Sequence, residues 1–150
     1  MPHSYVSCRM HYIFSIKNRK RIITPEMQPE LWAYMGGIAR EHGMKVLAVG
    51  GTDDHAHMLL GLPSTMSTAK GVQLVKGGSS KWLGRKFPAP RFFEWQEGYG
   101  AFGVAISGVE DTIDYIANQK EHHRHRTFKE EFLAFLKKHG IEYDERYVWG

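Results

Sequence analysis

The sequence predicts an α+β fold of the ferredoxin-like, split βαββαβ type, with an antiparallel sheet, two helices on one face, then one further helix and a C-terminal helix. Runs rich in β-branched and aromatic residues, bounded by turn residues, alternate with longer stretches whose apolar residues have helical spacing. Capping residues mark the ends of several of those stretches. No internal repeat, linker or low-complexity tract interrupts the chain, so residues 1–150 are expected to form a single domain.

The first strand and the first helix are predicted from composition and capping. Residues 4–16 are rich in Tyr, Val, Ile and Phe, which favours a strand. Residues 25–42 are predicted to be a helix, because Thr24 is a suitable N-cap and Pro25 suits the first helical position. Gly43 is then a natural C-cap glycine.

The second and third strands are predicted to pair as a hairpin. Residues 44–49 and 55–62 are apolar stretches of strand length. The Gly-Gly-Thr-Asp sequence of residues 50–53 between them is typical of a turn.

A second helix and a fourth strand are predicted to follow. Residues 67–85 have an apolar stripe at helical spacing, but Gly77 and Gly78 in the middle weaken the helix by about 1 kcal/mol each relative to alanine. We expect a kink or a close approach there. Residues 92–104 are aromatic and rich in glycine, which indicates a strand with a bulge or turn near Gly98.

The remaining residues are predicted to form two helices and a strand-like tail. The third helix is expected over residues 107–123, with Ser107 and Glu110 as a capping box. Residues 127–139 have the pattern of an amphipathic helix that ends before a glycine, and residues 141–149 are aromatic and strand-like.

Composition excludes several classes of protein. The chain is 42% hydrophobic and 24% charged, as in ordinary globular proteins. No apolar stretch approaches the roughly 20 residues that span a bilayer, and the N-terminus lacks the pattern of a signal peptide. A single cysteine, Cys8, excludes an internal disulfide. Together these observations predict a cytoplasmic protein with no membrane partner.

Basic charge is segregated along the chain. The net charge is +4, and no acidic residue occurs between Asp54 and Glu94. Such a distribution suits a nucleic-acid partner, although the charge taken alone favours a solvated helix face. The candidate DNA-binding residues are Lys17, Arg19, Lys20, Arg21, Lys76, Lys81 and Arg85.

Two histidines flank one small residue in the third predicted strand. Side chains alternate faces along a strand, so His55 and His57 are expected on one face, about 7 Å apart along it. Two imidazoles so placed can bind one metal ion, although a hydrogen-bonded pair of histidines is the simpler interpretation of the motif alone. The opposite face of the strand carries only apolar side chains, namely Ala56, Met58, Leu60 and Leu62.

The third predicted helix carries a tyrosine and a glutamine four residues apart. Tyr115 and Gln119 therefore share a helix face. A tyrosine hydroxyl can act as a nucleophile on a phosphate that a metal polarises, and the Gln119 amide oxygen can complete a His-His-Gln site suited to Mg²⁺ or Mn²⁺, with Zn²⁺ possible in principle. Alternatives remain open: Tyr115 as a core residue, Gln119 facing solvent, and His122 or His123 as the third ligand.

The His-Ala-His strand followed by a helical Tyr-x-x-x-Gln resembles the single-tyrosine HUH transposases of the insertion-sequence TnpA type and their relatives associated with repetitive extragenic palindromes. The similarity covers nearly the whole chain. It includes the first strand and basic turn, part of the second helix, the strand before the tyrosine helix and the C-terminal end, at residues 14–19 (FSIKNR), 76–83 (KGGSSKWL), 95–102 (WQEGYGAF) and 143–147 (YDERY).

This resemblance implies a DNA strand-transfer reaction. Tyr115 would attack a phosphodiester of single-stranded DNA, giving a 5′-phosphotyrosine and a free 3′-hydroxyl, and the reverse attack would rejoin strands. The metal ligands would be His55, His57 and Gln119, with Mg²⁺ or Mn²⁺ bound. The resemblance also implies a homodimer that recognises DNA hairpins, in which the tyrosine helix of one subunit completes the site of the other in several family members.

Two other functions are compatible with parts of the sequence. A catalytically silent DNA-binding protein of the same fold would need none of the His-His-Tyr-Gln set, whose presence argues against it. A small metallohydrolase with a histidine site would not need the long basic span without acidic residues. The resemblance favours the transposase.

Overall fold

The computed structural model describes residues 4–86 and 93–150. Four strands form one antiparallel sheet in the order β2-β3-β1-β4, which is the strand order of the predicted ferredoxin-like fold. In the full register of the central pair, Arg9 lies opposite Gly61 and Ser15 opposite His55. The strands are β1 (Arg9–Ser15), β2 (Lys45–Gly51), β3 (His55–Gly61) and β4 (Gly100–Gly103).

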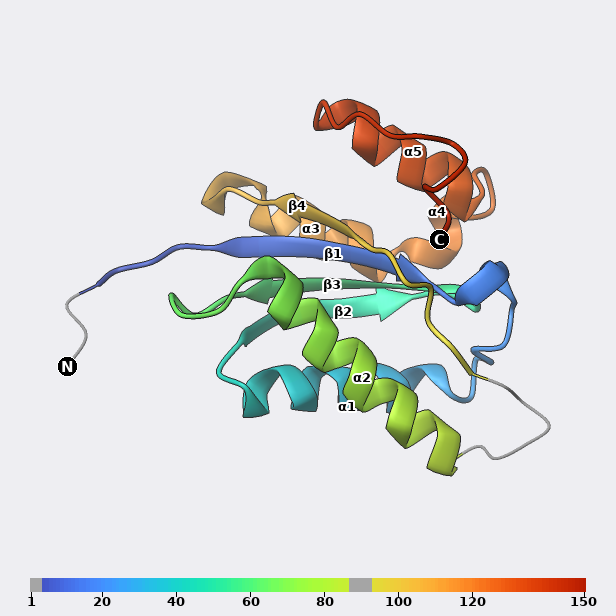
Figure 1. Cartoon of the computed structure of the whole chain (residues 1–150), viewed down its shortest axis with the longest axis horizontal. Coiled ribbons are helices and arrows are strands. Elements are labelled where there is room, and N and C mark those ends of the chain that lie inside the picture. Colours follow the sequence, from blue (N-terminus) through green and yellow to red (C-terminus); the bar gives the residue numbers. More distant parts are fainter. Residues whose placement is uncertain (1–3, 87–92) are drawn as a thin grey trace.

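Helices cover both faces of the sheet (Figure 1). On one face lie α1 (Gln28–Glu41) and α2 (Thr68–Lys86). On the other face lie the later helices α3 (Val109–Ala117), α4 (Gln119–His122) and α5 (Phe128–Lys138). The 3-10 turns η1 (Lys17–Arg19) and η2 (Ile106–Gly108) follow β1 and precede α3. None of the described helices is both long and apolar enough to cross a membrane.

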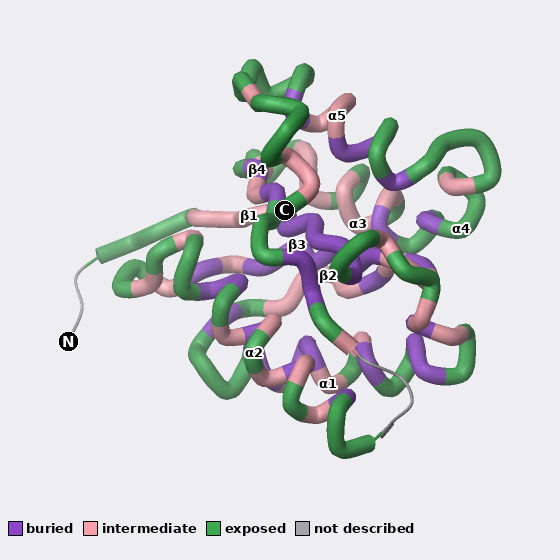
Figure 2. The backbone as a smooth tube through the Cα atoms, turned by 45° about the vertical axis from the view of Figure 1, so that its right-hand side comes forward, coloured by how far each residue is buried: buried purple, intermediate pink, exposed green. Residues whose placement is uncertain are grey.

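The larger core lies between the sheet and the α1–α2 layer. Ala56, Met58 and Leu60 of β3 enter this core, as the alternation of side chains along a strand predicts. The chain is buried along nearly all of β3, the purple stretch at the centre of Figure 2. The face of β3 that carries His55 and His57 therefore points toward the layer of α3, α4 and α5.

A second, smaller core fixes α5 on that other face. Ile13 of β1 and Phe102 of β4 pack with one stripe of α5, formed by Phe128, Phe132 and Leu136. The helix begins with a capping box, in which the Thr127 hydroxyl accepts from the Glu130 backbone N–H at 3.2 Å. The position of α5 over the histidine face thus follows from local capping and from apolar packing.

The limits of β1 and β4 differ from the sequence-based prediction. The first strand begins at Arg9 rather than residue 4, and the fourth covers only Gly100–Gly103 of the predicted 92–104, of which Phe92 lies outside the described residues. Before β4 the chain makes a single bridge between Ile16 and Trp95. There the Gln96 side chain replaces a ladder partner, because its Oε1 accepts from Ser15 N–H at 2.8 Å.

The N-terminal boundaries of two helices also differ. The first helix starts at Gln28 rather than residue 25, because the Thr24 hydroxyl caps a preceding turn by accepting from Met27 N–H at 3.3 Å. The predicted capping box at Ser107 is wrong, since no side chain caps α3. A 3-10 turn that includes Ser107 leads into that helix instead.

The predicted helix over residues 107–123 is divided in two. Asn118 adopts φ −105° and ψ 28°, so that α3 ends at Ala117 and α4 begins at Gln119. The strand-like tail over residues 141–149 is wrong as well, because it consists of turns and irregular backbone. The last residue is tied to the approach to β4, where the Gly150 carbonyl accepts from Gln96 Nε2 at 3.0 Å.

The two glycines in α2 permit a close approach rather than a break. The helix runs without interruption through Gly77 and Gly78. A Cβ on Gly78 would lie 2.7 Å from the Ile38 Cδ1 atom of α1, so the glycine lets the two helices pack closely. The alternative of a kink is therefore wrong.

We expect Gly50→Ala to destabilise the fold by about 1–3 kcal/mol, since it forces an atom into a packed contact. A Cβ on Gly50 would lie 2.8 Å from the Ile116 carbonyl oxygen of α3, which rests directly on β2. Gly77→Ala is the control, because no described neighbour lies near its Cβ and alanine favours a helix by about 1 kcal/mol. Urea unfolding measures both variants, and a Gly50→Ala protein as stable as the wild type would contradict the close contact.

Candidate metal centre and tyrosine site

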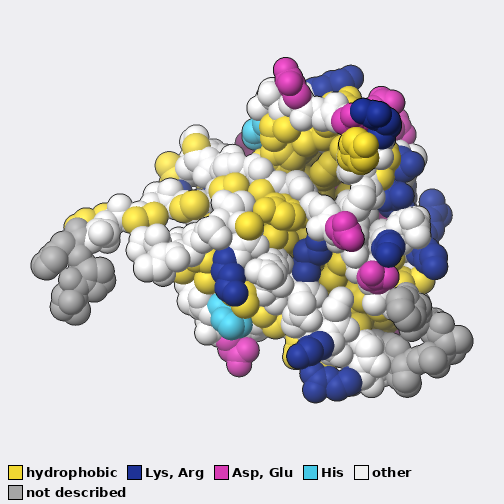
Figure 3. Space-filling model, in the orientation of Figure 1, with side chains coloured by type: hydrophobic (Ala, Val, Ile, Leu, Met, Phe, Trp, Pro, Cys, Tyr) yellow, Lys and Arg dark blue, Asp and Glu magenta, His cyan; other side chains and the backbone are white. Residues whose placement is uncertain are grey.

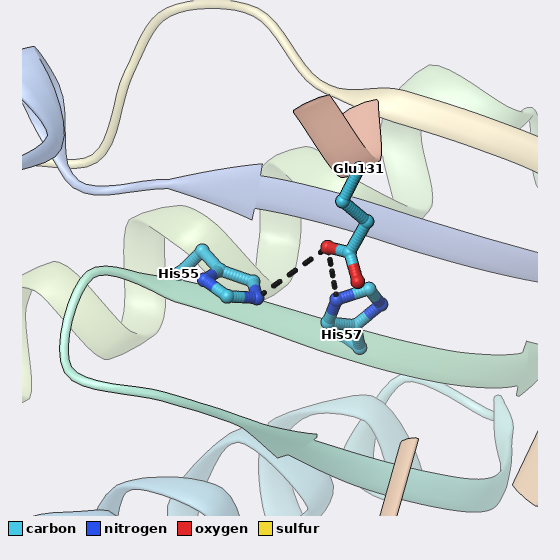
Figure 4. Close-up of side chains that lie close together, drawn as sticks. All are labelled: His55, His57 and Glu131. Atoms are coloured by element: carbon cyan, nitrogen blue, oxygen red, sulfur yellow. Dashed lines mark hydrogen bonds and ion pairs between the residues drawn. The ribbon is translucent and has the colours of Figure 1, made fainter. Parts of the chain in front are cut away.

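Strand β3 places His55 and His57 side by side beneath α5. Both side chains are fully buried, and their ring centroids are 5.1 Å apart. Figure 4 shows both imidazoles directed toward the carboxylate of Glu131, which descends from α5 between them. The predicted pair on one strand face is therefore present, and it is closed off from solvent by the helical layer.

Asp54 determines which nitrogen of His55 faces the cluster. Its Oδ1 atom lies 2.7 Å from His55 Nδ1, so that this nitrogen carries the hydrogen. Burial alone would raise the pKa of Asp54, but the hydrogen bond and the charge interaction with His55, together with Thr52 and His123, outweigh burial and lower that pKa. The Thr52 hydroxyl donates to the same carboxylate oxygen at 3.0 Å. His55 Nε2 is left to face inward, which is the arrangement that outer carboxylates impose on metal-binding histidines.

His57 is held by a third histidine that sequence reasoning missed. Its Nδ1 atom lies 2.8 Å from His11 Nε2, and its Nε2 atom lies 3.1 Å from Glu131 Oε1. Burial lowers the pKa of His57 to about 4, against the opposing effect of Glu131. Burial and the neighbouring His57 also hold the pKa of His11 well below its usual range. Both imidazoles are therefore neutral at pH 7, as metal ligation requires.

Glu131 is the principal site residue that sequence reasoning missed. It is 1% exposed, and its carboxylate lies among His55, His57 and His123. Burial raises the pKa of Glu131, but the surrounding histidines outweigh burial and hold the pKa far below its usual range. A signal was present in the sequence, because Glu131 falls on the same helical stripe as Phe128 and Phe132. A carboxylate on an apolar stripe is rarely buried without partners.

Helix α3 brings Tyr115 to the same cluster. Its hydroxyl donates a hydrogen bond to Glu131 Oε2, and its ring centroid lies 5.8 Å from that of His57. Burial, reinforced by the Glu131 carboxylate, raises the pKa of Tyr115 above its ordinary value. The hydroxyl is consequently a neutral donor at pH 7 and has a proton acceptor already in contact.

Gln119 lies at the start of α4 and is also buried, with 1% of its surface exposed. Its Oε1 atom is 3.0 Å from His55 Nε2, while its Nε2 donates to the Tyr115 carbonyl at 3.1 Å. The solvent-facing interpretation of this residue is therefore wrong. The structure brings all four predicted residues of the metal and tyrosine site together within one chain.

The two histidines considered as alternative third ligands, His122 and His123, have different surroundings. His123 Nε2 lies 3.3 Å from Glu131 Oε2 and is buried without a well-directed hydrogen bond among the described residues. His122 is exposed and packs against the Tyr115 ring at a centroid distance of 4.5 Å. Of the two, only His123 faces the cluster.

The donor set fits a divalent cation. When Nδ1 carries the single ring hydrogen of His55, the Nε2 lone pair is directed at two oxygens, Oε1 of Gln119 at 3.0 Å and Oε1 of Glu131 at 3.6 Å. Three electron-pair donors that converge in this way repel one another unless a cation lies between them. One ligand atom each of His55, His57 and Glu131 lie within 4.8 Å of one another. Adjacent ligands of an octahedral Mg²⁺ are about 3 Å apart, close to the distances from His55 Nε2 to Gln119 Oε1 (3.0 Å) and from His57 Nε2 to Glu131 Oε1 (3.1 Å).

The predicted DNA-binding residues differ in whether their charged groups are free or engaged within the fold. In Figure 3, Lys and Arg side chains gather on the right-hand side of the view. Lys20, Arg21, Lys81 and Arg85 are exposed, whereas Lys17 pairs with Glu94 at 3.4 Å and Arg19 donates to the Trp149 carbonyl at 3.1 Å.

Lys76 is engaged within the fold. Its ammonium donates to the carbonyl oxygens of Gln96, Glu97 and Gly98, at 2.6, 3.2 and 3.1 Å. Burial lowers its pKa to about 8. In this arrangement Lys76 fixes the segment that leads into β4.

Comparison with known proteins gives the class of this fold and site. The sequence profile of the family described as IS200-like transposases matches residues 4–119, so the chain belongs to that family. Transposases for the insertion sequence element IS200 from Salmonella typhimurium and Salmonella typhi are each 26% identical over 125 residues, which cover 81% of this chain and 82% of theirs. Membership implies a DNA-cleaving enzyme.

Two solved structures share the fold. A candidate transposase from Deinococcus radiodurans R1 superposes with a TM-score of 0.64 at 24% identity, over 79% of this chain and 96% of that one. A REP-associated tyrosine transposase bound to a REP hairpin gives a TM-score of 0.60 at 16% identity, over 82% and 73%. Glu131 lies beyond the segment that the family profile matches.

Proposed function

We propose that this protein cleaves and rejoins single-stranded DNA beside hairpins, through a metal-assisted 5′-phosphotyrosine intermediate. One observation carries the proposal: the hydroxyl of Tyr115 lies in the same buried cluster as His55, His57 and Gln119. A nucleophile next to a set of metal ligands is the arrangement that attack on a phosphodiester needs. The hairpin-bound relative of the same fold supports the class of substrate.

The metal would be held by His55, His57 and Gln119, with Glu131 as a fourth ligand. Nitrogen and oxygen donors of this kind suit Mn²⁺ or Mg²⁺. When bound, the metal supplies Lewis-acid stabilisation of charge on the scissile phosphate.

Glu131 is proposed to take the proton of the nucleophile. The hydrogen bond from the Tyr115 hydroxyl to Glu131 Oε2 already defines the path of that proton. As the bond between tyrosine Oη and phosphorus forms, the bond between phosphorus and O3′ breaks. Glu131 receives the hydroxyl proton, and the departing 3′-oxygen takes a proton from water to become a free hydroxyl.

Each active site is proposed to be built within one chain. Tyr115 contacts Glu131 of its own chain, and Gln119 contacts its own His55. The homodimer implied by the family resemblance stays a prediction. A site built in this way does not require a second subunit.

We expect cleavage of a hairpin oligonucleotide with single-stranded flanks to require Mg²⁺ or Mn²⁺ and to stop with EDTA. Mixing a His57→Ala protein with a Tyr115→Phe protein should not restore cleavage, because each chain then lacks part of its own site. Denaturing gels of labelled oligonucleotides measure both results. Hairpin binding without metal-dependent cleavage would instead indicate a silent DNA-binding protein, and restoration on mixing would contradict the single-chain site.

A further inference from the structure

A cavity of about 570 Å³ opens beside the metal cluster. It lies between the β2–β3 turn, the segment before α1 and the connection from α4 to α5. Thr52 and Asp54, which hydrogen-bond to His55, form one wall, and His123, whose ring lies 4.5 Å from that of His55, forms another. The cavity therefore shares its walls with the proposed active site.

The walls of this cavity are fixed by backbone hydrogen bonds. Ile16 N–H donates to the Asp54 carbonyl at 2.8 Å and Ile23 N–H donates to the Asp53 carbonyl at 2.9 Å, which fastens the β2–β3 turn to the preceding basic segment. Gln28 is buried in the lining and donates to the Ile23 carbonyl at 3.3 Å. A preformed concave site of this volume is typical of small-molecule and nucleotide binding.

Cations surround the mouth of the cavity. Four exposed basic side chains line it, and three of them, Arg21, Lys120 and Arg126, make no carboxylate ion pair within the described part of the chain. The fourth, Arg124, lies 3.5 Å from Glu121 in an exposed pair, which contributes little. Unpaired cations at the mouth suit a phosphodiester backbone.

Two of the acidic residues in the cavity lining are engaged in hydrogen bonds within the protein. Asp54 is hydrogen-bonded to His55 and Thr52, and Glu130 is committed to the capping box at Thr127. The carboxylate of Asp53 and the amide of the buried Gln28 also line the cavity. Carboxylate and amide groups can pair with the edge of a nucleobase.

Arg126 connects the cavity with the nucleophile. It lines this cavity and also a smaller one of about 310 Å³ that contains Tyr115 and His11. Its side chain therefore lies at the boundary between the larger cavity and the one that contains the nucleophile. A phosphate beside Arg126 would thus be within reach of Tyr115 while its neighbouring nucleotide occupied the larger cavity.

We propose that this cavity binds the base of one unpaired nucleotide next to the scissile phosphodiester, with Arg21, Lys120 and Arg126 on its phosphates. The inference rests on the proposed function, because it takes single-stranded DNA as substrate. A stacked base in a duplex cannot enter a walled cavity, so the site selects a nucleotide that is splayed out of the stack. The cavity thereby supplies a reason for cleavage in the single-stranded flank rather than in the stem.

The test measures binding without chemistry. The Tyr115→Phe protein in EDTA is titrated against one fluorescent DNA hairpin with four-nucleotide thymidine flanks, and each flank position is replaced in turn by an abasic nucleotide. We expect one abasic position to weaken binding about tenfold, since contacts to a single unpaired base have that effect. Abasic flanks that all bind as tightly as thymidine would overturn the proposal, because phosphate contacts alone would then explain the affinity.

A charge variant distinguishes binding of the single-stranded flank in the cavity from binding of the hairpin itself. Added to the same protein, Arg21→Gln with Lys120→Gln should weaken binding of the flanked hairpin about tenfold and leave a hairpin without flanks within about twofold. The matched control is Lys45→Gln with Lys70→Gln, which removes two exposed charges elsewhere and should affect both DNAs equally. Equal losses by the cavity variant on both DNAs would overturn the proposal. These binding tests are independent of the cleavage reaction. If the wild type forms a covalent adduct but no abasic position weakens binding, the nucleotide cavity is refuted and the proposed function is not.

Discussion

A Tyr115→Phe protein is expected to form no covalent adduct with DNA and to lose at least about 10⁴-fold of the cleavage rate, while its affinity for hairpins stays within about twofold. The substitution removes only the hydroxyl. The ring keeps its packing against His122 at 4.5 Å and Phe135 at 5.7 Å. Glu131 Oε2 loses one donor but keeps His123 nearby at 3.3 Å.

Denaturing electrophoresis of labelled oligonucleotides, with binding followed by fluorescence anisotropy, measures this prediction. Circular dichroism melting controls for folding. An adduct that persists in the Phe variant would show that another residue is the nucleophile. Cleavage at an undiminished rate without any adduct would show hydrolysis by a metal-activated water, which is the reaction of a metallohydrolase.

The second large effect is expected for Glu131→Gln, which should lower cleavage by about 10²–10⁴-fold. An amide is a weaker ligand than a carboxylate and cannot accept the Tyr115 proton. Because the proton must then leave to solvent, the remaining rate should increase with pH more steeply than that of the wild type. This increase with pH distinguishes a lost proton acceptor from a merely loosened fold.

Glu130→Gln is the matched control for that variant. The neighbouring residue is exposed, and glutamine can retain its part in the capping box with Thr127. Its activity should stay within about twofold of the wild type. A Glu131→Gln protein that is as active as the wild type, or more active, would contradict the role of Glu131 and would show that its carboxylate obstructs the site.

Local periodicity explains how much of the site the sequence predicts. His55 and His57 share a strand face because side chains alternate, and Tyr115 and Gln119 were expected on one helix face. In the structure the helix breaks at Asn118, but both residues still reach the cluster. The short separation along the chain keeps them together despite the break.

The missing part of the site comes from residues that are distant along the chain. His11 reaches His57 from β1, and Glu131 reaches it from α5, 74 residues further along the sequence. Strand pairing and helix docking create these contacts, and local spacing does not predict either of them. The order of strands was predicted correctly, because the succession of strands and helices follows from composition and hydrophobic period.

Helix boundaries and the structure of the tail were harder to predict, because local sequence patterns do not determine them. Ser107 has the right neighbour for a capping box in Glu110, yet a 3-10 turn occupies its place. Thr127 and Glu130 have the same spacing and do form the box. The aromatic tail packs the partly buried Val148 and Trp149 against the α5 core without joining the sheet, so its apolar content reflected local packing and not a strand.

The most direct test of the account is the location of the DNA–protein bond. Wild-type protein is incubated with Mn²⁺ and a flanked hairpin oligonucleotide, digested with trypsin and nuclease, and analysed by mass spectrometry. We expect a 5′-linked nucleotide on Tyr115 that forms only with metal and is absent from the His57→Ala protein. A nucleotide on any other residue, or metal-dependent cleavage that leaves no nucleotide on the protein, would contradict it.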